Sequence, residues 1–191
     1  MANEYGGTAG TWSVWMYPTN SAISAQKISI TGYDSVSPYG MYFGQGGTTP
    51  LTIVSGHIFT ASDPYSIYIS QTFGNPSAAK TRGIQFLGNI VQNSNGGSIS
   101  ISANAKIESG GTIQIAANQS GTSSDVIFDT RLGPNTAFVT RSGTFGVAAG
   151  STSPVNFSIK TNAAPITLNS AISVPGYIKL DMTDGGTISA S

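Results

Sequence analysis

The sequence predicts an all-β fold, a parallel β-helix (a solenoid) with three short strands in each turn. Three observations favour it: apolar and polar residues alternate in many short runs, uncharged polar residues take the place of charged ones, and part of the sequence repeats. The competing prediction is an antiparallel β-sandwich, which short alternating strands also permit.

The composition sets the classes of protein to consider. The 191 residues are 39% hydrophobic, enough for one core, but only 8% are charged, against about 25% in ordinary domains. Because the formal net charge is zero, nothing draws the chain to nucleic acid or to an anionic membrane surface. The absence of cysteine excludes thiolate metal sites, thiol catalysis and disulfides. No apolar run approaches the roughly 18 residues that span a bilayer, so no membrane insertion is expected.

Residues 1–90 are expected to be an irregular, aromatic-rich β region that forms the start or cap of the solenoid. Their short runs alternate with period two, as half-buried strands do. The clearest runs are 12–16, 27–31 and 66–70. Segments 33–40 and 73–77 between them are rich in turn-forming residues. No amphipathic helix is predicted.

Residues 91–191 are expected to form regular β-helical repeats that continue the same domain. From about residue 83 the strands become shorter and lie between Gly or Asn turns. The predicted strands are 83–86, 98–101, 105–107, 112–115, 125–128, 155–159, 166–168 and 177–180. The residues expected to point outward are Ser98, Ser100, Ser102, Thr112, Gln114, Thr167 and Lys179.

An internal repeat favours the solenoid over the sandwich. A shift of 65 positions places Ile101 on Ile166 and Ile113 on Ile178, with further matches between them, although residues 128–145 match poorly. Such a shift would equal three turns of about 22 residues, a period typical of solenoids. Sandwiches have no reason to repeat at a fixed period.

Two tracts of the second half resemble a known family. GGSISISANAKIESGGTIQIAANQ (96–119) and APITLNSAISVPGYIKLDMTDGGTISAS (164–191) resemble the β-helical repeats of filamentous-haemagglutinin-type exoproteins, the passengers of two-partner secretion. The resemblance implies a right-handed β-helix, export through an outer-membrane partner, and a role in adhesion, biofilm formation or contact-dependent activity. The NPNL and NPNG motifs of that family's secretion domain are absent from this sequence.

Aromatic residues are the candidate binding residues, because exposed aromatic faces stack on sugar rings or anchor interfaces. Filling an irregular core is their more ordinary role. The candidates are Trp12, Trp15, Tyr17, Tyr39, Tyr42, Tyr65 and Tyr68.

No catalytic, cofactor-binding or metal site is expected. The paired carboxylates Asp125 with Asp129 and Asp181 with Asp184 fit turns better than acid–base catalysis, because no basic or aromatic cluster accompanies them. The sole histidine, His57, has no nucleophile motif near it. The glycines after Asp184 do not complete a calcium-binding motif.

These observations favour a non-catalytic structural or adhesive module of a secreted or cell-surface microbial exoprotein. Its expected partner is a glycan or protein on a host or neighbouring cell. One alternative is an extracellular filament subunit that self-assembles through open β edges, with Thr187, Ile188 and Ser189 as edge contacts because no charge or proline protects them. A further alternative is a carbohydrate-active β-helix enzyme that uses Asp125 or Asp181.

Overall fold

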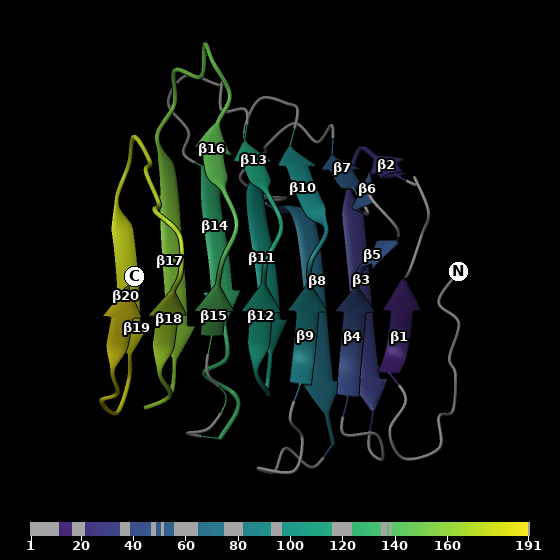
Figure 1. The fold of residues 1–191 in the computed structure, drawn as a ribbon, viewed down its shortest axis with the longest axis vertical. Coiled ribbons are helices and arrows are strands. Elements are labelled where there is room, and N and C mark those ends of the chain that lie inside the picture. The colour runs from purple at the N-terminus through teal and green to yellow at the C-terminus, as the bar shows by residue number, and fades with distance from the viewer. Residues whose placement is uncertain are drawn as a thin grey trace.

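The chain folds into a parallel β-helix with three strands in each full turn (Figure 1). The computed structural model describes residues 12–16, 22–34, 39–46, 49–50, 52–55, 65–74, 82–92, 97–115, 124–134, 137 and 139–190. Three parallel sheets, here named A, B and C, contain every described strand except one small antiparallel pair. That pair is β5 (Gln45–Gly46) with β6 (Thr49–Pro50). The β-helix prediction is therefore confirmed, and the antiparallel sandwich was wrong.

Successive turns contribute one strand to each sheet in the order A, B, C. Sheet A contains β1 (Trp12–Met16), β4 (Tyr39–Phe43), β9 (Arg82–Phe86), β12 (Ile107–Ser109), β15 (Val139–Arg141), β18 (Ile166–Leu168) and β20 (Ile188–Ala190). Sheet B contains β2 (Ala22–Ala25), β7 (Thr52–Ser55), β10 (Asn89–Gln92), β13 (Ile113–Ile115) and β16 (Phe145–Val147). Sheet C contains β3 (Ile28–Asp34), β8 (Tyr65–Phe73), β11 (Ser98–Ala103), β14 (Ser124–Asp129), β17 (Val155–Thr161) and β19 (Ile178–Met182).

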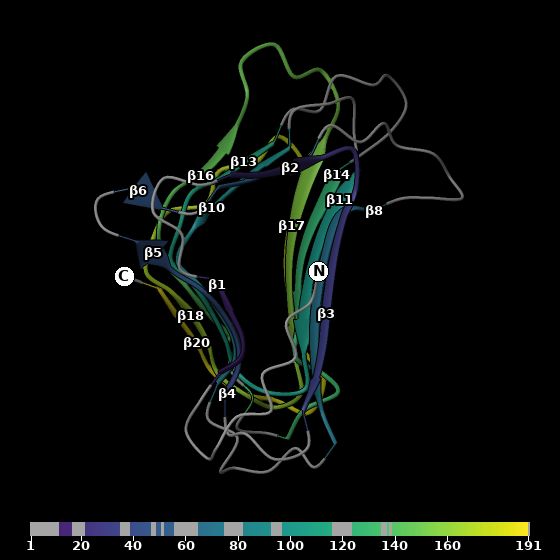
Figure 2. The same cartoon turned by 90° about the vertical axis from the view of Figure 1, so that its right-hand side faces the viewer.

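The coil is right-handed. In Figure 1 the strands of sheet A run upward at the front, those of sheet C run downward behind them, and the chain advances from right to left. Figure 2 looks along the axis and shows sheets A and C facing each other, with sheet B crossing above them. Right-handed connections between parallel strands are the rule, because the strand twist lets the chain return to the sheet only that way.

Columns of apolar side chains stacked along the axis form the core. On sheet C, Ile67, Ile99, Val126 and Phe157 pair in register on consecutive strands and are fully buried. The period-two alternation explains this, because every second side chain of a strand points to the same face. On β13, Ile113 and Ile115 are buried while Gln114 between them is exposed.

The turns differ in length, so the predicted fixed period was wrong. Hydrogen-bonded residues of adjacent turns are 22 positions apart at Thr167 and Ser189, as predicted, but 32 apart at Ser66 and Ser98. The shift of 65 aligns Ile101 on sheet C with Ile166 on sheet A, which are not equivalent. All three sheets use the same Ile-x-Ile pattern, so a shift can match one strand to another without equalling a whole number of turns.

The predicted outward residues are only partly exposed. Gln114, Thr112 and Lys179 are exposed, and Ser102 and Thr167 are half-buried. Ser98 and Ser100 are 5% and 7% exposed, so both are buried. The Oγ of Ser98 accepts a hydrogen bond from the backbone N–H of Asp125 (3.3 Å). Ser100 lies in register between Tyr68 and Ile127.

The last complete turn crosses the sheet B side without forming a strand. In four successive turns an apolar residue of sheet A is followed, six residues later, by an apolar residue on the sheet B side. The pairs are Ile84 and Ile90, Ile107 and Ile113, Val139 and Phe145, and Ile166 and Ile172. Ile172 and Val174 pack partly buried against the core, as strand residues would. A groove of about 540 Å³ remains between this segment and β16. Sheet B therefore ends one turn before sheets A and C.

Arg141 is a cation buried inside the core. It lies in register with Ser109 and Leu168 on sheet A, and its side chain is fully buried. Its Nη1 donates to the backbone oxygen of Ser109 (3.2 Å) and its Nη2 to that of Thr144 (2.7 Å). Within the described part of the chain, no carboxylate forms an ion pair with it. Burial lowers the pKa of Arg141 to about 10, because the guanidinium loses its hydration.

We expect Ile113→Asp to lower the free energy of unfolding by more than about 3 kcal/mol, because it buries a charge without a partner at a side chain that is 1% exposed. The control is Gln114→Asp on the exposed face of the same strand, which should change stability by less than about 0.5 kcal/mol. Thermal or urea unfolding followed by circular dichroism measures both. Equal effects of the two substitutions would contradict the inward position of Ile113.

We expect Arg141→Met to raise the free energy of unfolding by about 1 kcal/mol or more, because it removes a buried charge that lacks a counterion. Both carbonyls keep a backbone donor without it: the Ser109 oxygen accepts from Ser142 N (2.7 Å) and the Thr144 oxygen from Ile113 N (3.0 Å). Arg131→Met at an exposed arginine is the control. It should lower stability by less than about 1 kcal/mol.

The stability that Arg141→Met gains over the wild type should decrease as the pH rises above 10. The pKa of Arg141 is about 10 in the folded protein, below its ordinary value, so the cost of burying the charge is fully present below pH 10. Above that value the folded wild type releases the proton first and gains stability, and the difference between wild type and Arg141→Met should shrink. Urea unfolding between pH 7 and pH 11 measures this difference. A clear loss of stability in Arg141→Met at neutral pH would show that the guanidinium hydrogen bonds outweigh desolvation.

Candidate binding surface

A groove of about 650 Å³ opens on the outer face of sheet C, near the corner where the chain passes towards sheet A. Its floor comes from β8 and β11, whose strands pair in register from Ile67 to Gln71. One side is formed by the end of β14 and the turn after it, and residues of two later corners complete the lining. The groove therefore extends along the solenoid axis, across several turns.

The floor of the groove carries hydroxyl groups at regular spacing. Outward positions on neighbouring strands are about 4.8 Å apart in a sheet. Ser70 and Ser102 are paired in this way, and the hydroxyl of Ser102 donates to that of Ser70 (3.1 Å). Tyr68 and Ser100 form the adjacent pair, with the Tyr68 side chain half-buried in the lining.

Amide side chains form the corner end of the groove. Asn104 fixes this corner, because its Oδ1 accepts from Phe73 N (2.8 Å) and its Nδ2 donates to Phe73 O (2.9 Å). Asn162 lines the groove from two turns further along the axis. Its buried Oδ1 has no hydrogen-bond partner in the described part of the protein. Buried acceptors usually have a partner, so this atom is an exception to that rule.

An ion pair and a leucine form the rim. Arg131 donates from Nη2 and Nε to the two carboxylate oxygens of Asp129 (2.7 and 3.1 Å) in a bidentate arrangement. Burial raises the pKa of Asp129, but the hydrogen bonds and charge of Arg131, with the charge of Lys160, more than offset it, so the pKa lies below its usual value. Leu132 follows on the same turn and is 89% exposed.

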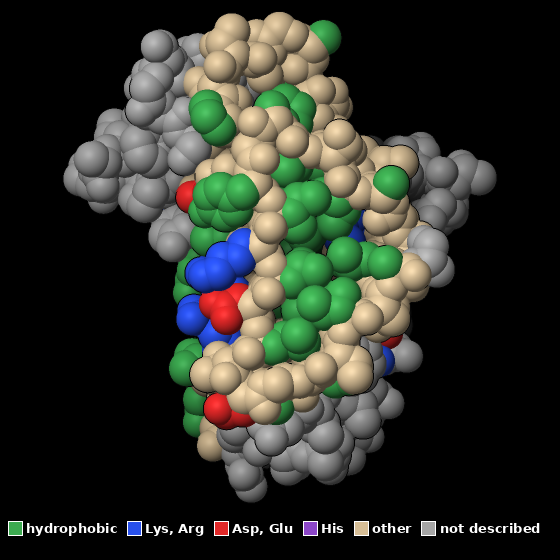
Figure 3. All heavy atoms as spheres, turned by 90° about the vertical axis from the view of Figure 1, so that its left-hand side faces the viewer, with side chains coloured by type: hydrophobic (Ala, Val, Ile, Leu, Met, Phe, Trp, Pro, Cys, Tyr) green, Lys and Arg blue, Asp and Glu red, His purple; other side chains and the backbone are tan. Residues whose placement is uncertain are grey.

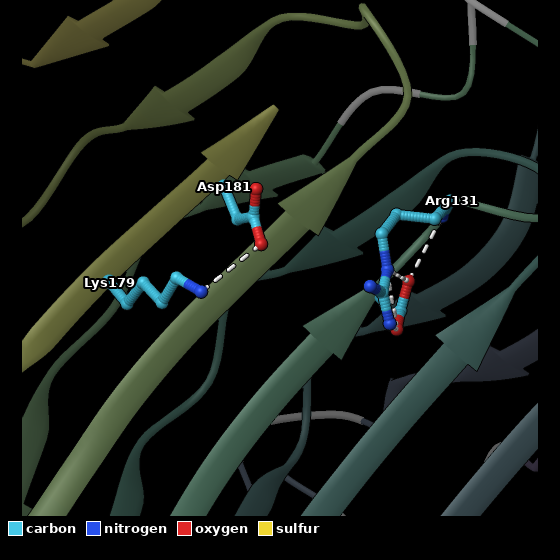
Figure 4. Close-up of polar contacts among 4 residues, drawn as sticks. Arg131, Lys179 and Asp181 are labelled. Carbon is cyan, nitrogen blue, oxygen red and sulfur yellow. Dashed lines mark hydrogen bonds and ion pairs between the residues drawn. The ribbon is translucent and has the colours of Figure 1, made fainter. Parts of the chain in front are cut away.

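A second ion pair lies further along the same face, as Figure 4 shows. Lys179 and Asp181 of β19 are 3.3 Å apart. Lys160 of β17 lies in register between Asp129 and Asp181, so charges alternate along this column. Opposite charges on adjacent strands stabilise the pairing, whereas like charges would repel.

The structure places only one predicted aromatic candidate in the groove. Tyr68 lines it, while Tyr42 is half-buried on the outer face of sheet A. Four others lie on described strands, but their side chains are outside the described part. They are Trp12 and Trp15 on β1, Tyr39 on β4 and Tyr65 on β8. Tyr17 lies outside the described residues altogether.

Asp125 and Asp129 are too far apart on β14 to act together as an acid–base pair. Asp125 and Asp129 are on the same face of β14, four residues apart, which separates their backbones by about 13 Å. Acid–base catalysis on glycosides requires carboxyls about 5 to 9.5 Å apart. Asp125 accepts a hydrogen bond from Asn156 Nδ2 (2.7 Å), and the lowered pKa of Asp129 makes it a poor proton donor at neutral pH. Asp184 follows β19 at an exposed turn.

The C-terminal end of the solenoid exposes apolar side chains. Tyr177 is 56% exposed, and Ile178 and Ile188 are 48% exposed. Figure 3 looks at this end and shows hydrophobic side chains gathered across its middle, with few charged ones. The predicted edge residues Thr187, Ile188 and Ser189 are all exposed. Here β19 and β20 are the last described strands of sheets C and A.

The residues that the structure describes contain no group of three or more His, Cys, Asp or Glu that could hold a metal ion. His57 lies outside the described ranges. No helix in the described part is long and apolar enough to cross a membrane.

The sequence did not identify the groove itself. Leu132 and Asn162 are in corners of different turns, and neither belongs to a motif. The exposed leucine beside the bidentate ion pair indicates a binding groove only when the stacked arrangement of the turns is known. Comparisons with known proteins add no assignment, since no family model, no curated protein and no solved structure matches the chain.

Proposed function

We propose that the protein is a non-catalytic structural and adhesive module of a secreted or cell-surface microbial exoprotein. The observation that carries this proposal is the unbroken parallel ladder of sheets A and C, which makes a stiff rod and leaves its lateral faces open to partners. The resemblance of residues 96–119 and 164–191 to filamentous-haemagglutinin-type repeats supports the same function. The partner is a glycan or protein on a host or neighbouring cell.

The surface chemistry supports adhesion more than catalysis. Near the outer face of sheet C two ion pairs join charged side chains, Asp129 with Arg131 and Lys179 with Asp181. The carboxylate of Asp125 accepts a hydrogen bond from Asn156. The carboxylates that an enzyme would use are therefore engaged in hydrogen bonds or ion pairs. A neutral hydroxyl-rich face suits contact with a hydrated surface. The carbohydrate-active enzyme is therefore the weaker proposal.

The adhesion proposal predicts that beads coated with the folded chain attach to cells. Purified protein is coupled to microspheres at a fixed density and mixed with suspended bacterial cells and with cultured epithelial cells. We expect at least about tenfold more attached beads than with Ile113→Asp, which should lose the fold that presents the lateral faces. Equal attachment of coated, variant-coated and bare beads to every cell type would contradict an adhesive function.

A second candidate function is a filament subunit, and the apolar C-terminal end favours it. Unpaired edge strands present free N–H and C=O groups, and β20, the last described strand of sheet A, contains no charged residue to repel another strand. The first described strands of sheets A and C are β1 and β3. Head-to-tail stacking of one molecule on the next would continue sheets A and C, and such a contact is open-ended.

The filament proposal predicts that the chain associates in a concentration-dependent way. Sedimentation velocity should show the average sedimentation coefficient rising with concentration for the wild type, and Ile188→Lys should shift it to the monomer value, because it adds a charge to the apolar end. Gln114→Lys adds the same charge to the exposed face of β13 and should not change association. A wild type that stays monomeric at all concentrations would contradict the filament.

A further inference from the structure

The groove on sheet C has a lining that is apolar on two surfaces and polar between them. Tyr68 on the floor and Leu132 on the rim offer apolar surface, and Leu132 is 89% exposed. Between them lie the hydroxyls of Ser70 and Ser102, with the amide residue Asn162 further along the lining. A ligand that fits this lining has apolar faces and a hydroxylated edge. Sugar rings have both.

The charge of the groove favours a neutral ligand. Among its described lining residues only Asp129 and Arg131 are charged, and they neutralise each other through a bidentate ion pair. Hydrogen bonding with Asp129 raises the pKa of Arg131, and the pKa of Asp129 is lowered, so both stay charged at neutral pH. A sulfated or phosphorylated ligand would need an unpaired cation in the groove, and its described lining offers none.

The direction of the groove favours a chain rather than a single ring. The lining residues come from β8, β11, the end of β14 and the corners at Asn162 and Thr183, which follow one another along the axis. Polar groups therefore recur with the strand spacing of about 4.8 Å. This spacing is close to the advance of one pyranose unit in an extended polysaccharide. Two successive sugar units can then meet the equivalent hydroxyls of Ser70 and Ser102 on neighbouring strands.

We propose that this groove binds a neutral polysaccharide chain, laid across the strands along the solenoid axis. Tyr68 and Leu132 contact the apolar faces of the sugar rings. Ser70 and Ser102 exchange hydrogen bonds with their hydroxyl groups. The inference deepens the proposed adhesive function, because it names the class of surface ligand.

The test is a binding panel with the full chain. Neutral oligosaccharides of the cellulose, starch, chitin, mannan and galactan types and a sulfated heparin oligosaccharide are immobilised, and hits are measured by titration calorimetry. We expect binding to at least one neutral member and none to heparin. Binding to heparin alone, or to no neutral member, would overturn the proposal.

Two variants and a matched control locate the site. Leu132→Ala should weaken binding about three- to tenfold without lowering thermal stability, because the side chain is almost fully exposed. Tyr68→Ala should weaken binding by a similar factor through lost stacking. The control is Tyr42→Ala, a half-buried tyrosine on the outer face of sheet A, which should leave affinity unchanged. Unchanged affinity in both groove variants would overturn the assignment.

The bead assay separates this inference from the function on which it rests. If wild-type beads attach to cells, and beads with Leu132→Ala or Tyr68→Ala attach equally well, the groove proposal fails and the adhesive function stands. If the wild type binds a neutral oligosaccharide through these residues but its beads attach to no cell, the adhesive function fails and the groove proposal stands.

Discussion

In-register stacking of one turn on the next is the constraint on which the rest of the structure depends. A strand of three residues such as β12 or β13 cannot bury a face by itself. Parallel pairing supplies such a strand with neighbours on both sides. On sheet C the same pairing stacks Ile99 on Ile67 and Val126 on Ile99. The backbone hydrogen bonds and the apolar columns therefore require the same register. A slip by one residue would turn every inward side chain outward.

The candidate binding surface is a consequence of the same register. The alternation that buries Ile99 and Ile101 turns Ser100 and Ser102 to the other face of the strand. Stacking then aligns these serines with Tyr68 and Ser70, and brings the corner residues Leu132 and Asn162 to one groove. The polar columns outside and the apolar columns inside have equal spacing because they share a backbone.

Much of the fold could be predicted from the sequence, because it depends on local alternation. Ile113, Gln114 and Ile115 alternate between core and solvent as their pattern predicts. The length of each turn could not be predicted, since extra corner residues cost little loop entropy and leave no mark on the strands. Strand β15 was not predicted, because Arg141 occupies an inward position and interrupts the apolar pattern by which strands are recognised. The division of the chain near residue 90 stays a prediction.

The unequal turns give the molecule two independent dimensions. Each turn advances the rod by one strand spacing, about 4.8 Å, whether it contains 21 residues between paired positions, as from Asn156 to Tyr177, or 32, as from Ser66 to Ser98. Added residues accumulate at the corners and thicken the rod without lengthening it. The number of turns thus determines the length of the rod, and the length of the corners determines the shape of its lateral surface. Either can change during evolution without disturbing the other.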